Sequence, residues 1–120
     1  MINGDYNMFV NDLYYGAEYN FSYKDREYFI QSWYENDKDR YWIGLSRLVP
    51  VLDPYLFEYY SDTSMAECVE EFMKAKVFDG KTFAEIEAEA EWLNSEPNDI
   101  EEATKKYWKK HPNETPDGIV

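Results

Sequence analysis

Aromatic side chains are concentrated in one stretch of this sequence, and that concentration most restricts the folds open to the chain. Residues 17–60 contain 13 of the 23 aromatic residues. Within this stretch Tyr19, Phe21 and Tyr23 alternate with polar residues, which is the period-2 pattern of a strand with one buried face. Side chains that alternate in this way point to opposite sides of a pleated surface. We therefore expect residues 17–60 to form a β-sheet.

Short polar or proline-containing segments divide this stretch into four predicted strands. The predicted strands cover residues 17–23, 28–34, 41–45 and 55–60. The polar segments 24–27 and 35–39 are too short for the crossover connection that neighbouring parallel strands require, so adjacent strands should be antiparallel. The sequence therefore predicts a four-stranded, mostly antiparallel meander.

Both faces of the second and third predicted strands carry large side chains. Phe29 and Trp33 point to the side opposite Tyr28 and Ile30, and Trp42 opposes its own neighbours in the same way. Aromatic rings on an uncovered sheet face can stack on a ligand ring or form the centre of a protein interface. Alternatively, helices partly cover both faces and the rings belong to the core. The sequence leaves both interpretations open.

Helical periodicity lies on both sides of the predicted sheet. Apolar residues from Tyr6 to Leu13 recur at helical spacing and Gly16 follows them, which predicts an N-terminal helix packed on the sheet. Ser64 and Thr82 each stand three residues before a glutamate, the spacing of a capping box, and predict the two helices of a helical hairpin. A short C-terminal helix completes a predicted α+β fold.

The length and the cysteine count restrict the organisation of the chain. A chain of 120 residues predicts one domain, which we expect over residues 1–112 with a flexible tail over 113–120. No apolar run is long enough to cross a membrane, and the N-terminal sequence predicts no secretory signal. Cys68 is the single cysteine, so we expect a small core residue and a cytoplasmic protein without disulfides.

The charge balance restricts the possible partners. The chain has 25 acidic and 12 basic residues, which gives a net charge of −13. Solubility of a small domain requires a net charge of only about 2 to 8 in magnitude. Such an excess of acids argues against direct binding to nucleic acid or anionic lipid, because both are held by clustered lysine and arginine. We therefore expect a basic protein as partner.

Residue patterns for catalysis and metal binding are missing from the sequence. The one histidine, His111, stands beside Pro112 near the predicted tail, where it cannot serve as the base of a Ser-His or Cys-His pair. A zinc site needs several clustered cysteines and histidines. With 25 acids, some pair of carboxylates will lie at a usable distance by chance, so such a pair predicts no reaction. We predict no enzymatic activity, no metal and no cofactor.

Acidic residues are dense in the predicted helical hairpin. In its second helix, glutamates four residues apart would form two rows with members about 6 Å apart along the axis. That spacing is comparable to the spacing of phosphates along a nucleic-acid strand. A solvated acidic face that serves only solubility would have the same pattern. The candidate partner-binding residues are Glu67, Glu70, Glu71, Glu85, Glu87, Glu89, Glu91, Tyr59, Tyr60 and Trp92.

In composition, the chain resembles the small acidic proteins encoded by phages and mobile elements. This group includes DNA-mimic inhibitors and anti-CRISPR proteins. The resemblance implies an inhibitor that binds a basic, nucleic-acid-binding protein in place of nucleic acid. The aromatic residues of the predicted sheet support an alternative, a module that binds a carbohydrate or another ligand by ring stacking.

Overall fold

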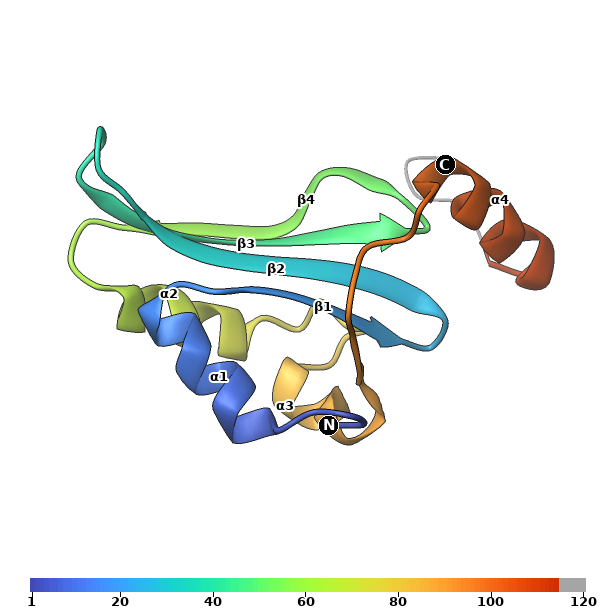
Figure 1. Cartoon of the computed structure of the whole chain (residues 1–120), viewed down its shortest axis with the longest axis horizontal. Coiled ribbons are helices and arrows are strands. Elements are labelled where there is room, and N and C mark those ends of the chain that lie inside the picture. The colour runs from blue at the N-terminus through green and yellow to red at the C-terminus, as the bar shows by residue number, and fades with distance from the viewer. Residues whose placement is uncertain (115–120) are drawn as a thin grey trace.

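The computed structural model of the chain describes residues 1–114. Its elements in chain order are α1 (Tyr6–Tyr15), β1 (Glu18–Tyr23), β2 (Arg26–Glu35), β3 (Arg40–Val49), β4 (Leu52–Ser61), α2 (Met65–Lys74), α3 (Phe83–Ile86), the 3-10 helix η1 (Glu87–Glu89), β5 (Glu91–Leu93) and α4 (Ile100–Lys110). Helices α1, α2 and α3 lie on one side of the sheet, and α4 lies at one end of it (Figure 1). The predicted α+β class is confirmed. None of the helices within the described residues is long and apolar enough to cross a membrane.

The sheet has five strands in the order β4-β3-β2-β1-β5, and all neighbours are antiparallel. The first four strands form the predicted meander, because connections of only a few residues join them. The fifth strand corrects the predicted count of four. In this strand Trp92 and Leu93 pair with Phe21 and Asn20 of β1. The face that α1, α2 and α3 cover is called the inner face here, and the opposite one the outer face.

The segment that follows Thr82 differs from the predicted second helix of a helical hairpin. Helix α3 ends at Ile86, where the backbone angles leave the α-helical range, with φ −107° and ψ −3°. One 3-10 turn follows, and the backbone is extended from Ala90 into β5. The prediction of a helical hairpin was therefore wrong. β5 pairs with the free edge of β1 and satisfies its backbone N–H and C=O groups, which a continued helix would leave unpaired.

The first two helices begin at side-chain caps, and the sequence predicts the second of them. The side chain of Asp5 accepts a hydrogen bond from the backbone N–H of Met8 at 3.1 Å. Gly16, with φ 91°, ends α1 in a conformation that favours glycine. The side chain of Ser64 accepts from the N–H of Glu67 at 3.2 Å and starts α2. These bonds satisfy amides that the first helical turn leaves without a partner.

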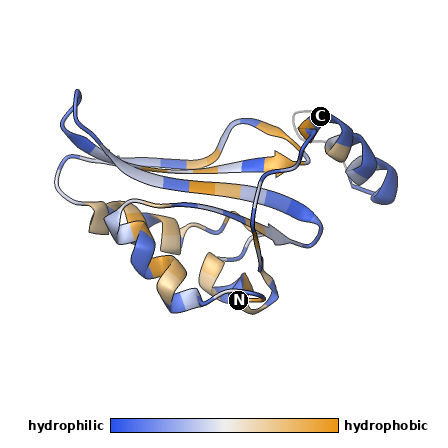
Figure 2. Cartoon of the chain, in the orientation of Figure 1, coloured by the Kyte–Doolittle hydropathy of each residue, from blue (hydrophilic) through white to orange (hydrophobic). Residues whose placement is uncertain are grey.

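The core lies between the three helices and the inner face. Phe21 of β1 is fully buried, and its ring centroid lies 5.2 Å from that of Tyr28 and 5.3 Å from that of Phe83. The ring of Phe78 completes this group at 6.0 Å from Phe21. Hydrophobic bands on α1 and α2 contrast with the largely hydrophilic α4 (Figure 2). The aromatic stretch of the sequence therefore builds the core with its inward-pointing half.

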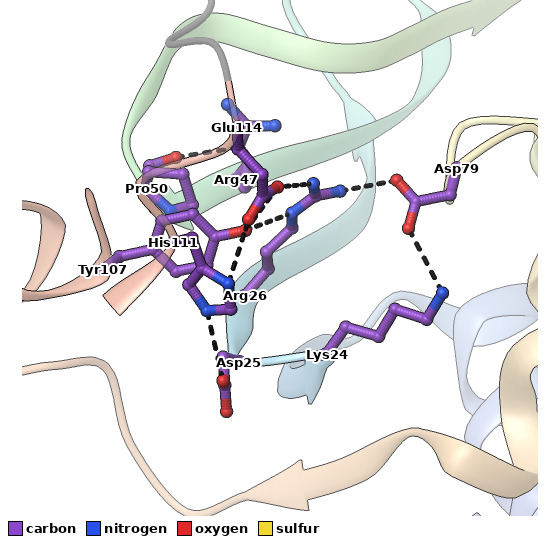
Figure 3. Close-up of polar contacts among 9 residues, drawn as sticks. All are labelled: Lys24, Asp25, Arg26, Arg47, Pro50, Asp79, Tyr107, His111 and Glu114. Carbon is purple, nitrogen blue, oxygen red and sulfur yellow. Dashed lines mark hydrogen bonds and ion pairs between the residues drawn. The ribbon is translucent and has the colours of Figure 1, made fainter. Parts of the chain in front are cut away.

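Helix α4 is joined to the rest of the molecule by a polar network centred on Arg26 (Figure 3). The guanidinium of Arg26 donates to the hydroxyl of Tyr107 at 2.9 Å, to Asp79 at 2.7 Å and to Glu114 at 2.5 Å. Burial lowers the pKa of Arg26, but these hydrogen bonds outweigh burial and raise it. One side chain of β2 thus holds α4, the connection between α2 and α3, and the residues after α4.

A second contact lies where α4 ends. The Nε2 atom of His111 is 3.3 Å from a carboxylate oxygen of Asp25 in the turn between β1 and β2. Of the tail predicted over residues 113–120, Glu114 takes part in the Arg26 network. The rest of that tail, residues 115–120, lies outside the described part of the chain.

Candidate functional site

Aromatic rings cluster on the outer face of the sheet, near the turn between β2 and β3. Trp33 and Trp42 are direct cross-strand partners, and their ring centroids lie 4.8 Å apart. Tyr60 of β4 is the partner of Trp42 on its other side. The side chain of Trp33 is 43% exposed, since α1, α2 and α3 all lie on the inner face (Figure 1). This face is therefore open to a ligand or a partner.

Trp42 is nearly buried although no helix of residues 1–114 lies over it. Only 3% of its surface is exposed. Its indole ring lies over Gly44, two residues on in the same strand, where a Cβ atom would come within 2.3 Å of the ring. The indole Nε1 donates a hydrogen bond to a carboxylate oxygen of Glu58 at 2.7 Å. Both contacts fix the orientation of the ring on the outer face.

An arch in β4 forms one wall of the site. Leu45 and Arg47 of β3 pair with Phe57 and Leu52 of β4, so four residues of β4 stand opposite one residue of β3. The extra residues bow away from the sheet, as the path of β4 shows (Figure 1). Tyr55 lies in this arch, and its ring meets that of Trp42 edge-on at 5.6 Å. Irregular strand pairing of this kind is a common means of directing a side chain into a site.

The rings and acids together line an open hollow of about 580 Å³, which we call the aromatic hollow. Its volume falls within the range of about 300 to 1,000 Å³ that is common for ligand pockets. The residues that line it are Trp33, Tyr34, Glu35, Asn36, Asp37, Trp42, Tyr55, Glu58 and Tyr60.

The rim of the aromatic hollow carries an internal cation. The guanidinium carbon of Arg40 lies 3.8 Å from the centroid of the Tyr60 ring. The Nε atom of Arg40 is 3.4 Å from a carboxylate oxygen of Glu35, and Lys38 reaches the same carboxylate at 3.8 Å. A guanidinium over an aromatic face is attracted by the negative charge density of the ring. The rim thus combines ring faces and carboxylates around a positive group.

Glu67, one of the predicted partner-binding acids, is used inside the fold. Its carboxylate accepts hydrogen bonds from Tyr59 at 2.6 Å, Thr63 at 2.7 Å and Ser61 at 2.9 Å. The bond from Tyr59 is the main cause of the lowered pKa of Glu67, and it raises the pKa of Tyr59 to about 12. Two of the predicted residues, Glu67 and Tyr59, therefore hold the start of α2 against the end of β4.

The two predicted rows of carboxylates are not formed. They required one continuous helix, and residues Glu87 to Leu93 form a 3-10 turn and a strand instead. Glu85 closes the capping box of α3. Glu87 binds the amino group of Met1 at 2.7 Å. Glu89 and Glu91 are exposed outside any α-helix, so the proposed match to phosphate spacing was wrong for this segment.

The remaining predicted residues are distributed over several elements. Glu70 is exposed on α2, and Glu71 pairs with Lys74 one turn later at 3.3 Å. Trp92 is 40% exposed and borders a small apolar pocket of about 100 Å³ beside the N-terminal segment. Of all the predicted partner-binding residues, Tyr60 alone lines the aromatic hollow.

Groups suited to covalent catalysis or metal binding are not assembled in the described part of the chain. Cys68 is fully buried, and burial is the main cause that raises the pKa of its thiol to about 11, which disfavours the reactive thiolate. The ring of His111 stacks on Tyr107 of α4 at 4.3 Å, whereas Cys68 lies in α2. Within residues 1–114 no group of three or more His, Cys, Asp or Glu could hold a metal ion.

Sequence reasoning found part of the aromatic hollow. The alternation in β2 and β3 placed Trp33 and Trp42 on a face that could be open. It did not select Tyr55, Glu58 or Gly44. A glycine two residues after a tryptophan in a strand is a usable signal, because it leaves space on the same face for the ring. The arch that places Tyr55 depends on the register between two strands, which has no local signal.

Comparisons with known proteins assign no family to this arrangement. No protein-family model matches the chain, and no curated protein or solved structure is significantly similar to it. A fold alone does not determine a function, which depends on the chemistry of a site. The function is therefore inferred from the rings, charges and exposure of the aromatic hollow.

Proposed function

We propose that this protein is a non-enzymatic, cytoplasmic binding module that recognises a basic protein partner through the aromatic hollow. The observation that carries the proposal is the open cluster of Trp33, Trp42, Tyr55 and Tyr60 on the outer face of the sheet, with the carboxylate of Glu58 held among the rings. Tryptophan and tyrosine are enriched among the residues that dominate binding energy at protein interfaces.

The charge of the chain supports a basic partner. A net charge of −13 on 120 residues attracts positively charged proteins at long range and accelerates their association at low salt. Exposed ion pairs contribute only about 0 to 1 kcal/mol each, so charge alone does not make a tight complex. The rings of the aromatic hollow offer the apolar contact that the acids lack.

Inhibition of a nucleic-acid-binding protein, as by a DNA mimic or an anti-CRISPR protein, is a narrower form of this proposal. The net charge and the resemblance in composition support it. The predicted rows of carboxylates no longer support it, because Glu87 to Leu93 do not form an α-helix. In this form the exposed acids Glu70, Glu89 and Glu91 would steer a partner, and the aromatic hollow would hold it.

A carbohydrate ligand is the second candidate, and one observation favours it. Trp33 is 43% exposed and lines the same hollow as the polar residues Asn36, Asp37 and Glu58. An exposed ring face next to hydrogen-bonding side chains suits the apolar face and hydroxyl groups of a sugar. Titration of tryptophan fluorescence with oligosaccharides distinguishes the two candidates, since a saturable change without any basic partner would favour the sugar.

Affinity capture with matched variants tests the protein-binding proposal. The double variant Trp33→Ala and Glu58→Gln removes the exposed ring and the central charge, whereas the control Glu96→Gln and Glu102→Gln removes two exposed charges elsewhere. We expect basic proteins that are captured by the wild type and the control to be lost with the Trp33 and Glu58 variant. Each captured protein is then purified and its affinity for all three forms is measured at low and high salt.

The same measurements can contradict the proposal. Equal affinity of a purified partner for the wild type and for the double variant would place the interface outside the aromatic hollow. If a partner binds DNA and this protein at once, the DNA-mimic form is excluded while the binding module remains. A loss of affinity with rising salt is expected for steering by charge.

A further inference from the structure

The rim of the aromatic hollow already holds one guanidinium, and it shows what the surface accepts. Arg40 places its guanidinium 3.8 Å from the centroid of Tyr60 and its Nε 3.4 Å from Glu35. Ring face and carboxylate thus contact the same positive group from two sides. Stacking and charge pairing of this kind are typical of arginine, whose flat, weakly hydrated head suits both.

A second ring and carboxylate in the same hollow, those of Trp33 and Glu58, contact no cation among residues 1–114. The Oε2 atom of Glu58 accepts from the indole of Trp42 at 2.7 Å and from the hydroxyl of Tyr60 at 3.0 Å. Both bonds converge on this one oxygen, so Oε1 has no hydrogen-bond donor within the described residues. The exposed ring of Trp33 lies next to Trp42, 4.8 Å between centroids. The carboxylate is therefore fixed in place with one oxygen available.

The charges in the hollow complement a further positive group. Lys38 and Arg40 both pair with Glu35, and the three carboxylates that line the hollow still outnumber these two cations. Asp37 and Glu58 also line the hollow, and neither forms an ion pair within residues 1–114. Two carboxylates without a counter-charge, next to exposed rings, favour a cation over a neutral ligand.

We propose that the aromatic hollow binds an arginine side chain of the partner, with the guanidinium stacked on Trp33 and paired with Glu58. This inference rests on the proposed protein-binding function and names its recognition element. Arginine fits better than lysine, because a guanidinium is planar and can stack on the Trp33 ring while one of its N–H groups donates to Oε1 of Glu58. A volume of about 580 Å³ exceeds one guanidinium, so residues that flank the arginine in the partner also fit.

Peptides that differ at one position test this inference with the full chain. Three peptides of identical sequence carry arginine, lysine or citrulline at the centre, and citrulline keeps the shape of arginine without its charge. Binding is followed by calorimetry and by the NMR signals of the tryptophan indole N–H groups. We expect the arginine peptide to bind about tenfold more tightly than the citrulline peptide and severalfold more tightly than the lysine peptide.

Two variants separate the contributions of charge and ring. Glu58→Gln keeps an oxygen that can accept from Trp42 but removes the charge. We expect about a tenfold loss of affinity for the arginine peptide, a smaller loss for the lysine peptide and no loss for the citrulline peptide. Trp33→Leu removes the stacking ring without touching the bond between Trp42 and Glu58, and should weaken all three peptides. Glu96→Gln, an exposed acid that lines no part of the hollow, is the matched control and should change nothing. Circular dichroism verifies that each variant is folded.

The outcomes distinguish this inference from the function on which it rests. Equal binding of the arginine and citrulline peptides, with shifts at Trp33 and Trp42, would overturn the arginine site and leave the binding surface intact. An unchanged affinity in Glu58→Gln would overturn it as well. If no peptide shifts either indole signal while a basic partner binds the double variant of Trp33 and Glu58 as well as the wild type, the proposed function itself fails.

Discussion

Trp42 is buried on the outer face of the sheet because its own strand provides the space that holds it. Gly44 lies under the indole, and an ideal Cβ at that position would come within 2.3 Å and 2.6 Å of two ring atoms. Both atoms belong to a rigid ring, so the conflict cannot be relieved by a small rotation. Trp33, Tyr55 and Glu58 surround the remaining sides. The glycine therefore determines where the most buried ring of the hollow lies.

Substitution of that glycine should displace the ring and weaken the fold. In Gly44→Ala, we expect the indole of Trp42 to tilt away and its hydrogen bond to Glu58 to lengthen. Overpacking of a well-filled site typically costs about 1–3 kcal/mol, so the free energy of unfolding should fall by that amount. Urea denaturation measures the loss, and tryptophan fluorescence reports the change around the ring.

Ser46→Ala is the matched control, since Ser46 lies on the same strand and the same face. This change adds no atom, and its effect on the free energy of unfolding should stay within about 0.5 kcal/mol. If Gly44→Ala were as stable as the control and kept the fluorescence of the wild type, the ring would not depend on the glycine.

Among the elements, α4 depends most on side-chain charges for its position. It contacts the sheet mainly through β3 and is largely hydrophilic (Figure 2). Tyr107 is the buried residue of this helix, and its hydroxyl binds both Arg26 and Glu114. Lys110 adds an ion pair with Asp25 at 3.3 Å. A helix attached in this way should respond to pH before the core does.

Acid should release α4 from the sheet. The hydrogen bond from Tyr107, followed by that from Arg26, lowers the pKa of Glu114, and Lys110 lowers the pKa of Asp25. Because both pKa values are lowered by folding, the stabilisation is complete above the ordinary values of 4.5 and 3.8. It is lost as the pH falls through the lowered values. Hydrogen exchange at pH 6 and pH 3, corrected for intrinsic rates, should show reduced protection of α4.

Arg26→Gln is the companion variant for this measurement. It removes the charge that joins Tyr107, Asp79 and Glu114, so α4 should lose protection already at pH 6 while β2 and β3 keep theirs. Equal protection of α4 and β3 at pH 3 in the wild type would show that α4 is held by packing instead.

Local sequence patterns predicted β1 to β4 and the first two helices, but they did not predict β5. Polar turns and period-2 alternation located β1 to β4, helical spacing located α1, and a cap located α2. Residues 83–93 contain many alanines and glutamates, which favour helix, and apolar residues at helical spacing. The same segment alternates Glu89, Ala90, Glu91 and Trp92 with a period of two. The free edge of β1 decided between the two patterns, and that edge is visible only in three dimensions.

At the scale of the whole molecule, the aromatic hollow and the lysines of α4 lie at opposite ends. The molecule extends 43 Å along its long axis, with the turn between β2 and β3 at one end and α4 at the other (Figure 1). The aromatic hollow lies near that turn, and four lysines of α4 occupy the opposite end. A basic partner should therefore approach the end with the hollow, since the lysines repel it from the other.

The pairing of β5 with β1 also bears on the order in which the chain folds. Leu93 pairs with Asn20, 73 positions earlier, whereas β1 to β4 pair with their sequence neighbours across short turns. Closing a long loop costs more entropy before any contact repays it, so we expect the meander to form first and β5 to dock last.

In stopped-flow refolding, Leu93→Ala should accelerate unfolding and leave the folding rate unchanged, whereas Ile43→Val in β3 should slow folding. A folding rate reduced by Leu93→Ala would instead place β5 in the folding nucleus. On the expected outcome, β5, the strand that local sequence patterns do not predict, is the last part of the sheet to form.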